Sequence, residues 1–343
     1  MITQTINNLI QGLKPRQREI LSGRFGLESE EVQTLAGLGE QYDITRERVR
    51  QIEAEALRLV RAQFHANKEL QEKILGPIYA HLHTYGGLRR DDFLVQELRE
   101  IFHDNNLHHW HLRFLSGVIG EPRYYSSDDS FHFFWYSDKD AVKHAQKFIN
   151  YLEKLIADKK EDLIIHQKFQ DYFAQAVLQH DFSHEHGMNY LSVSRKFEKN
   201  PFGDFGLSHW EEINPRTMRD KAYLVLKKRG EPMHFTDVAK AINEVGFRDD
   251  RKALSQTVHN ELIKDDRVVL VGRGIYGLKE RGYMEGTCRD VLRSILKNQG
   301  PLSLEEIVQK VAEQRFLKHN TILLNLQNKK FFKRFGEGRY HVA

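Results

Sequence analysis

Hydrophobic and polar positions along residues 34–61 follow the period of two helices separated by a short break. On a helical wheel of the second segment, one side carries the apolar residues Val49, Ile52, Ala56, Leu59 and Val60, and the other carries Arg46, Glu47, Arg50 and Gln51. The pattern predicts a helix that packs through one face and exposes the other.

The start of this second helix is marked by Thr45 and Glu47. A threonine hydroxyl can accept a hydrogen bond from a free N–H of the first turn, and a glutamate in that turn complements the positive end of the helix dipole. We expect the stretch from Gly39 to Asp43 to supply the break between the helices. Together these features predict a helix-turn-helix whose second helix enters the major groove of DNA while the first lies across the backbone.

The exposed side of the second helix carries three kinds of side chain that distinguish base edges. An arginine can bind the O6 and N7 atoms of guanine, a glutamate can accept from the N4 amine of cytosine, and a glutamine can pair with adenine. Arg46, Glu47 and Gln51 supply one of each. The sequence therefore predicts a protein that binds duplex DNA.

Two stretches, LKPRQREILSGRFGL at 13–27 and TRERVRQIE at 45–53, resemble region four of housekeeping-type sigma factors of bacterial RNA polymerase. That region binds the minus-thirty-five promoter box, so the resemblance implies the same role here. It implies base reading by Arg46, Glu47 and Gln51 and contacts with the DNA backbone by Arg24, Arg48 and Arg50, with Thr45 completing the DNA-binding set.

This sequence departs from the sigma pattern in two places. Ala36-Gly37 replaces a pair of acidic or helix-favouring residues and weakens the first helix, and Glu55 stands where a lysine that meets activators is common. The resemblance covers about a fifth of the chain, and no other stretch resembles the sigma segment that melts the minus-ten element, so we do not expect a complete initiation factor. The alternative for the Arg/Glu-rich helix is a solvated face held by ion pairs within one turn.

After residue 65 the chain repeats a helix, a short Pro/Gly break, two amphipathic helices and two short strands. The repeats end on aromatic segments at 130–136 (SFHFFWY), 203–210 (GDFGLSHW), 272–278 (GRGIYGL) and 336–342 (GEGRYHV). Glycine permits a tight wing turn, and the aromatic residue on the returning strand closes a small core. The spacing predicts four winged-helix-type modules.

The third repeat, residues 218–283, resembles the HARE-type helix-turn-helix domain, with Arg281 in place of a tryptophan that often follows the wing. The resemblance implies a winged-helix-like fold that contacts DNA or polymerase and does not catalyse. We therefore expect a mainly α protein with these domains: 1–65 sigma region-four-like, 66–137 and 138–214 winged-helix-like, 215–283 HARE-type, and 284–343 winged-helix-like.

In a winged helix the third helix often enters the groove, which gives two further sets of candidate DNA contacts. They are Ser255, Gln256, His259 and Asn260 in the third repeat, and Asn320, Asn325, Gln327 and Lys329 in the fourth. Winged helices also serve as protein-interaction modules, so protein contact stays open for each repeat. The glycines at 272, 274 and 277 lie in a wing turn and do not open a helix after a parallel strand, which argues against a phosphate loop.

The formal net charge of +4 is modest for 343 residues, so an electrostatic footprint on DNA must be local. Basic runs at 216–229 and 329–339 predict sequence-independent phosphate contacts, with solvated faces as the alternative reading. The single cysteine, Cys288, excludes an intramolecular disulfide. With no apolar run long enough to span a bilayer and no signal-peptide pattern, we expect a cytoplasmic, nucleoid-associated protein.

A metal enzyme or nuclease is the rival from another class of protein. It rests on two histidine-rich stretches, which contain His103, His108, His109 and His111, and His180, Asp181, His184 and His186. Their spacing matches no HExxH or tetrahedral pattern.

The sequence therefore predicts a non-enzyme with no cofactor, metal or small-molecule substrate. Its partners are expected to be double-stranded DNA and bacterial RNA polymerase, through the flap of the beta subunit. Two functions remain open: a sequence-specific transcription regulator, and an accessory or sigma-mimicking factor whose winged helices mediate protein contacts.

Overall fold

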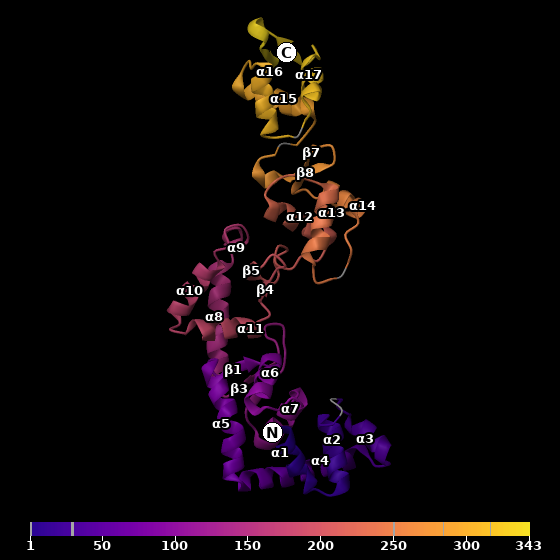
Figure 1. Cartoon of the computed structure of the whole chain (residues 1–343), viewed down its shortest axis with the longest axis vertical. Coiled ribbons are helices and arrows are strands. Elements are labelled where there is room, and N and C mark those ends of the chain that lie inside the picture. Colours follow the sequence, from indigo (N-terminus) through magenta and orange to yellow (C-terminus); the bar gives the residue numbers. More distant parts are fainter. Residues whose placement is uncertain (1, 29–30, 250, 284, 316) are drawn as a thin grey trace. The chain divides into compact units, whose positions relative to one another are not determined.

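The computed structural model describes residues 2–28, 31–249, 251–283, 285–315 and 317–343 (Figure 1). Over these residues the chain is mainly α-helical with small antiparallel sheets, which confirms the predicted fold class. It divides into two compact units. The first consists of Met1–Lys159 and Gln170–Phe197, and the second of Lys160–Phe169 and Glu198–Ala343.

Four helices form the N-terminal domain: α1 (Ile2–Gln11), α2 (Pro15–Phe25), α3 (Leu35–Tyr42) and α4 (Arg46–Ala66). Helices α2 and α3 both pack against α4. The contact is a small core of Ile20, Leu38 and Val49, each at most 1% exposed. This core fixes the angle between α3 and α4, because one apolar side chain from each of the three helices fills it.

The next segment has the order helix, strand, two helices, two strands. Its elements are α5 (Lys68–Thr84), β1 (Leu88–Arg90), α6 (Asp91–Phe102), α7 (His109–Ile119), β2 (Arg123–Tyr125) and β3 (Phe134–Tyr136). The returning strand β3 lies between β1 and β2 and is antiparallel to both, with Tyr136 opposite Leu88 on one side and opposite Arg123 on the other. This is a winged-helix topology.

The hydrophobic core of the N-terminal domain continues into this segment without a break at residue 65. Helix α7 packs against α1, α2 and α4. Phe25 of α2 meets Phe114 of α7 edge to face at 5.2 Å, and Phe64 and Phe114 are fully buried in the shared core. Residues 2–136 therefore fold around a common apolar centre.

The second repeat departs from this order. It contains α8 (Lys139–Ile156), α9 (Lys160–Ile164), α10 (Phe169–Gln179), α11 (His184–Val193), β4 (Phe197–Lys199) and β5 (Phe205–Leu207). The strands β4 and β5 pair with each other, and no first strand occurs among the described residues of this repeat. The division between the two compact units falls inside 138–214.

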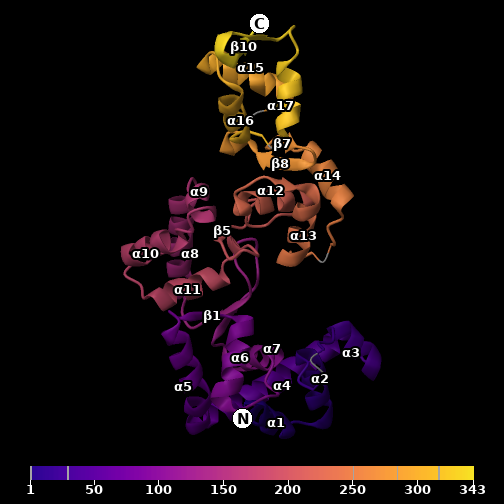
Figure 2. The same cartoon turned by 45° about the horizontal axis from the view of Figure 1, so that its top comes forward.

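The third repeat restores the winged-helix order, and the fourth keeps its three helices and final strand pair (Figure 2). The third has α12 (Met218–Arg229), β6 (Met233–His234), α13 (Phe235–Val245), α14 (Ser255–Ile263), β7 (Val268–Gly272) and β8 (Ile275–Leu278), followed by the short helix η1 (Lys279–Arg281). Its sheet order, β6-β8-β7, again places the returning strand in the middle.

The fourth repeat has α15 (Cys288–Gln299), α16 (Leu304–Ala312), α17 (His319–Leu326), β9 (Phe332–Arg334), the short helix η2 (Gly336–Gly338) and β10 (Tyr340–Val342). A bridge between Leu302 and Tyr340 stands where the other winged helices have their first strand. The returning strands β3, β5, β8 and β10 all lie in the aromatic segments that the sequence marks as repeat endings. The domain boundaries themselves stay a prediction.

Candidate nucleic-acid interface

The turn between α3 and α4 is shorter than the sequence pattern predicts. Gly39 and Tyr42 belong to α3, and the break consists of Asp43, Ile44 and Thr45. Asp43 takes the left-handed conformation at φ 55°, and the Ile44 N–H donates back to the Gly39 carbonyl at 2.9 Å. The prediction that the break runs from Gly39 to Asp43 is therefore wrong, because the chain keeps its helical bonds until a single left-handed residue turns it.

Thr45 caps α4 as predicted. Its Oγ1 accepts a hydrogen bond from the Arg48 N–H at 3.1 Å, which satisfies one of the free donors of the first turn. One turn into the helix, Val49 is fully buried. The cap and this anchor fix where the first two turns of α4 lie.

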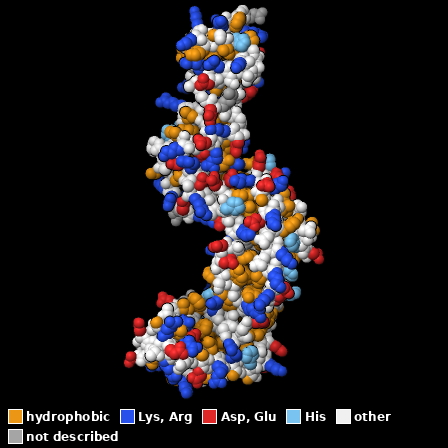
Figure 3. All heavy atoms as spheres, turned by 180° about the vertical axis from the view of Figure 1, so that it is seen from behind, with side chains coloured by type: hydrophobic (Ala, Val, Ile, Leu, Met, Phe, Trp, Pro, Cys, Tyr) orange, Lys and Arg blue, Asp and Glu red, His pale blue; other side chains and the backbone are white. Residues whose placement is uncertain are grey.

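The predicted DNA-reading side of α4 is exposed to solvent. Its members are Arg46, Glu47, Arg48, Arg50 and Gln51, and the structure exposes all five on the first two turns. Figure 3 shows both signs of charge intermixed over one face of the protein. The helix therefore presents donors and an acceptor side by side, which is what base and phosphate contacts require.

These side chains contact one another along the helix. Arg50 donates to both carboxylate oxygens of Glu47, at 2.9 and 2.7 Å, and Arg48 donates to the Gln51 amide oxygen at 3.2 Å. The hydrogen bonds from Arg50 hold the pKa of Glu47 below its usual range, so this side chain is an ionised acceptor at neutral pH. The ion pairs of the alternative reading are thus present. Exposed pairs of this kind contribute only about 0–1 kcal/mol, so DNA can replace them easily.

Arg24 differs from the other predicted contacts because it is only partly exposed and faces its own domain. Its Nε lies 3.4 Å from Glu53 Oε1 on α4, and its Nη1 donates to the Gln33 carbonyl at 2.5 Å. The side chain thus ties α2 to α4 and to the segment before α3. A phosphate contact by Arg24, which the sigma resemblance implies, stays a prediction.

The third helix of the next winged helix, α7, is not available to a DNA groove. It is covered by α1, α2 and α4, and Arg61 of α4 donates to its last carbonyls, to Val118 at 2.7 Å and to Gly117 at 2.9 Å. Arginine at a helix C-terminus satisfies free carbonyls and complements the dipole. The sequence gives no sign of this role, because Arg61 lies 57 and 56 residues from the two carbonyls that it contacts.

The candidate contacts of the third repeat lie on α14. Gln256 and Asn260 are exposed and hydrogen-bond to each other at 3.3 Å, and Ser255 is half-buried at the helix start. His259 is half-buried as well, with its ring stacked on Phe235 at 4.4 Å between centroids. The two amides can face a partner, whereas His259 packs within its own module.

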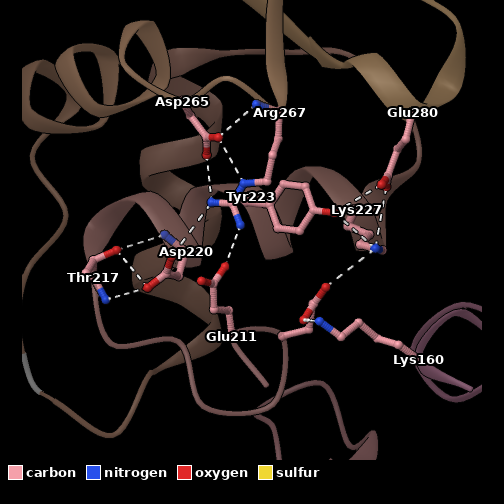
Figure 4. Close-up of polar contacts among 10 residues, drawn as sticks. Lys160, Glu211, Thr217, Asp220, Tyr223, Lys227, Asp265, Arg267 and Glu280 are labelled. Carbon is pink, nitrogen blue, oxygen red and sulfur yellow. Dashed lines mark hydrogen bonds and ion pairs between the residues drawn. The ribbon is translucent and has the colours of Figure 1, made fainter. Parts of the chain in front are cut away.

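The three lysines of the basic run at 216–229 lie inside the fold, whereas Arg216 and Arg229 are exposed. Lys227 is 8% exposed and its Nζ donates to the Tyr223 hydroxyl at 3.0 Å, with carboxylate oxygens of Glu280 at 3.6 Å and Glu212 at 3.7 Å (Figure 4). Burial by itself would lower the pKa of Lys227, but the hydrogen bond with Tyr223 and the two carboxylates raise it above its usual value. The ammonium is therefore held as a buried cation by this module.

Two further lysines of the run also have their charge paired inside the fold. Lys221 is 1% exposed and pairs with Asp249, and Lys228 donates to Asp204 at 2.9 Å and to the Ile164 carbonyl at 2.8 Å. The prediction that these lysines contact DNA phosphates is wrong. Helix α12 is buried from Lys221 to Lys227, so the cations in this part must find partners within the protein, whereas Arg229 at its end is exposed.

The fourth repeat keeps its basic run on the surface. Lys329, Lys330, Lys333 and Arg334 are exposed, and so are the candidates Asn320 and Gln327. Asn325 is instead half-buried, and its amide donates to the Thr321 carbonyl of its own helix at 2.8 Å. Of the two predicted basic surfaces, this one is accessible.

Four histidines of the histidine-rich stretches make contacts inside the fold, whereas His103 and His184 are exposed. The rings of His108 and His111 lie 3.8 Å apart between centroids in the shared core, and His109 Nδ1 lies 2.7 Å from Asp91 Oδ1. His180 Nδ1 lies 3.0 Å from the Ala176 carbonyl oxygen. Among the described residues, no three histidine, cysteine or acidic side chains gather so that they could hold a metal ion.

Cys288 is half-buried at the start of α15, and burial raises the pKa of its thiol, which disfavours the reactive thiolate. Within the part of the chain that the structure covers, we find no helix that is long and apolar enough to cross a membrane.

Comparison with known proteins identifies two segments. Residues 9–62 match the family model of Sigma-70, region 4, and residues 216–280 match the HARE-HTH family model, a helix-turn-helix domain of ASXL and restriction endonuclease type. RNA polymerase sigma factor SigA of Microcystis aeruginosa is 40% identical over 68 residues, which are 20% of this chain and 16% of SigA. RNA polymerase sigma factor RpoD of Neisseria gonorrhoeae is 43% identical over 58 residues, which are 17% of this chain and 9% of RpoD.

This chain thus spans about a sixth of the length of SigA from Microcystis aeruginosa and less of RpoD. Both matched segments coincide with helix-turn-helix elements of the structure, α1–α4 and α12–β8. Residues 9–62 are therefore a sigma-70 region 4 domain and residues 216–280 a HARE-HTH domain, which makes this chain a helix-turn-helix protein of DNA-binding domain types, related to sigma factors over its N-terminal fifth.

Proposed function

We propose that this protein is a sequence-specific DNA-binding transcription regulator that recognises a promoter minus-thirty-five-like element through α4. One observation carries the proposal: the exposed side of the first two turns of α4 displays Arg46, Glu47, Arg48, Arg50 and Gln51 on a helix start fixed by a cap and a buried anchor. The segment that displays them matches region 4 of sigma-70.

The side chains divide into two roles by their chemistry. Arg46, Glu47 and Gln51 offer a bidentate donor, an ionised acceptor and an amide, which suit guanine, cytosine and adenine edges in the major groove. Arg48 and Arg50 supply positive charge for phosphates, which positions the helix without reading sequence. Each base contact contributes about 1–3 kcal/mol of discrimination. That gain exceeds the roughly 0–1 kcal/mol of an exposed ion pair that it replaces.

The test is selection of DNA from a random duplex pool by the full chain and by single variants. We expect Gln51→Ala to flatten the preference at one base position, because the amide that pairs with adenine is gone. We expect Arg48→Ala to weaken binding to all sequences alike and to reduce the slope of log affinity against log salt by about 0.9. Selection of an unchanged consensus with equal stringency by Gln51→Ala would remove the base-reading role.

Arg58→Ala is the matched control for Arg48→Ala. Arg58 is also an exposed arginine on α4, but it lies ten residues further along, which is about 15 Å along the helix axis. We expect this variant to keep both the consensus and the salt slope. An equal loss of affinity in both arginine variants would mean that total charge drives binding and that the position of the side chain on α4 does not matter.

A second function, as an accessory factor of RNA polymerase, is favoured by apolar side chains on the HARE-type module. Leu254 before α14, Ile263 at its end and Leu270 on β7 are 60%, 63% and 47% exposed. Exposed apolar side chains at the two ends of α14 and on β7 suit a protein partner better than phosphates. Under this proposal the module contacts the polymerase while α4 binds the promoter.

Two assays separate the functions. Purified RNA polymerase core enzyme retained by the immobilised chain favours the accessory factor, whereas DNA selection without polymerase contact favours the regulator. Run-off transcription from a linear template with the selected site, using core enzyme with and without a housekeeping sigma factor, tests initiation directly. We expect no specific transcript without the sigma factor, and such a transcript would overturn both proposals in favour of a divergent initiation factor.

A further inference from the structure

The C-terminal module has a strongly basic segment beside an apolar cleft. The stretch 329–339 contains five basic residues and one acid, Glu337, which gives it a net charge of +4. The side chain of Glu337 lies outside the described set, and no described acid lies within ion-pair distance of Lys329, Lys330, Lys333 or Arg334. Among the described side chains, these four cations therefore have no carboxylate partner like those that hold the lysines of α12.

The cleft beside these cations has a volume of about 660 Å³ and lies between the end of α17 and the wing formed by β9, η2 and β10. The described residues of its walls are Leu326, Gln327, Lys329, Phe332, Lys333, Arg334, Phe335 and Tyr340, and none of these is an acid. Leu326, Phe332 and Tyr340 are at most 8% exposed and make a firm apolar floor. The volume falls within the range of small-ligand sites.

Phe335 stands out on the rim of this cleft. It is 51% exposed although it directly follows β9, and its backbone N–H is fixed by the Arg339 carbonyl at 2.8 Å. The exposed ring therefore adds a flat apolar surface to the rim of the cleft, beside Lys333 and Arg334. Figure 3 shows lysine and arginine side chains over the same module. The partner must therefore combine flat apolar surface with negative charge.

We propose that this cleft binds single-stranded nucleic acid, with an unpaired base stacked on Phe335 and the backbone phosphates held by Lys329, Lys333 and Arg334. Base stacking on an exposed aromatic ring next to a basic groove is the physical basis of single-strand binding. A duplex keeps its bases stacked inside, so it would satisfy the cations but leave Phe335 and the apolar floor uncovered. This site is separate from α4, and it does not depend on the duplex-reading proposal.

The test uses fluorescence anisotropy of the full chain with a labelled thymidine strand of about 12 nucleotides. Three competitors of equal length accompany it: an abasic strand with the same phosphates, a duplex, and a uridine strand that compares RNA with DNA. We expect the thymidine strand to bind more tightly than the abasic strand and the duplex. Phe335→Ala should weaken binding to the thymidine strand by roughly 5-fold or more, and it should leave the abasic strand unaffected.

Phe335→Trp and Leu324→Ala are the controls for this ring. A tryptophan keeps a stacking surface, so its fluorescence should be quenched by the thymidine strand and its affinity retained. Leu324 is a more exposed apolar residue of the same module, at 68%, and it does not line the cleft, so its removal should change nothing.

The cations are tested by Lys333→Ala and Arg334→Ala against Lys310→Ala, a lysine on α16 outside the cleft. Each of the first two should reduce the single-strand salt slope by about 0.7, and Lys310→Ala should not. Equal affinity of wild type and Phe335→Ala for the thymidine strand would refute base stacking. Tighter binding to the duplex than to the single strand would replace the proposal with a duplex-phosphate contact of the wing.

Discussion

The close approach of Gly39 to the turn of the helix-turn-helix gives a prediction in which two similar substitutions act in opposite directions. A Cβ atom added at Gly39 would lie 2.8 Å from the Ile44 backbone oxygen, closer than real Cβ atoms come. A Cβ atom at Gly37, two residues earlier on α3, would meet only the Thr34 Oγ1 at 3.4 Å. We therefore expect Gly39→Ala to destabilise the turn and Gly37→Ala to stabilise α3.

The magnitude follows from two terms. Replacing glycine by alanine inside a helix stabilises it by about 1 kcal/mol, and this gain is common to both variants. Overpacking against a neighbour that cannot rotate away costs about 1–3 kcal/mol, and only Gly39→Ala incurs it, since its neighbour is backbone. The difference between the two variants isolates the overpacking, which corresponds to a factor of roughly 5 to 150 in the local opening equilibrium.

Native-state hydrogen exchange of the full chain, resolved by peptide, measures this opening. Peptides covering α3 and the start of α4 should exchange at least about 5-fold faster in Gly39→Ala than in Gly37→Ala. The amide of Ile44, which bonds to the Gly39 carbonyl, should change most. Peptides from α15 to α17 have a core of their own and serve as the internal control. Equal exchange in the two variants would show that the turn adjusts freely and that the close approach at Gly39 does not restrain it.

Two further predictions concern the contact between α7 and the N-terminal domain. Burial and the neighbouring His108 lower the pKa of His111 to about 4. Between this pKa and the ordinary value, His111 is protonated in the unfolded chain but neutral in the native state. Stability should fall by up to about 3 kcal/mol as pH drops from roughly 6.5 to 4, and His111→Asn should remove this dependence in urea titrations. Arg61→Ala should loosen the same contact by about 1–3 kcal/mol, because the carbonyls of Gly117 and Val118 lose charged donors. Exchange in α7 peptides no faster than in wild type would contradict that role for Arg61.

Local sequence determined the form of α4. Three local features define this helix: the spacing of its apolar residues, the cap at Thr45 and the polar series from Arg46 to Gln51. Each acts within a few residues, so the sequence alone predicts it. The structure agrees, because Val49 is buried and the polar series is exposed. The returning strands could be predicted for the same reason, since glycine turns and aromatic residues mark them, but the departure of the second repeat from the winged-helix order could not. The length of the break between α3 and α4 could not be predicted from the sequence, because one left-handed residue, Asp43, is enough to make the turn.

Only the tertiary structure decided which basic side chains are buried in ion pairs and which are exposed. The runs at 216–229 and 329–339 look alike in sequence, yet Lys221 and Lys228 are neutralised by Asp249 and Asp204, which lie 28 and 24 residues away, while the second run stays on the surface. The burial of α7 by α4 is equally distant in sequence. The pattern of apolar residues along a helix predicts which face is buried. It does not predict which element covers that face, because the covering element is far away along the chain.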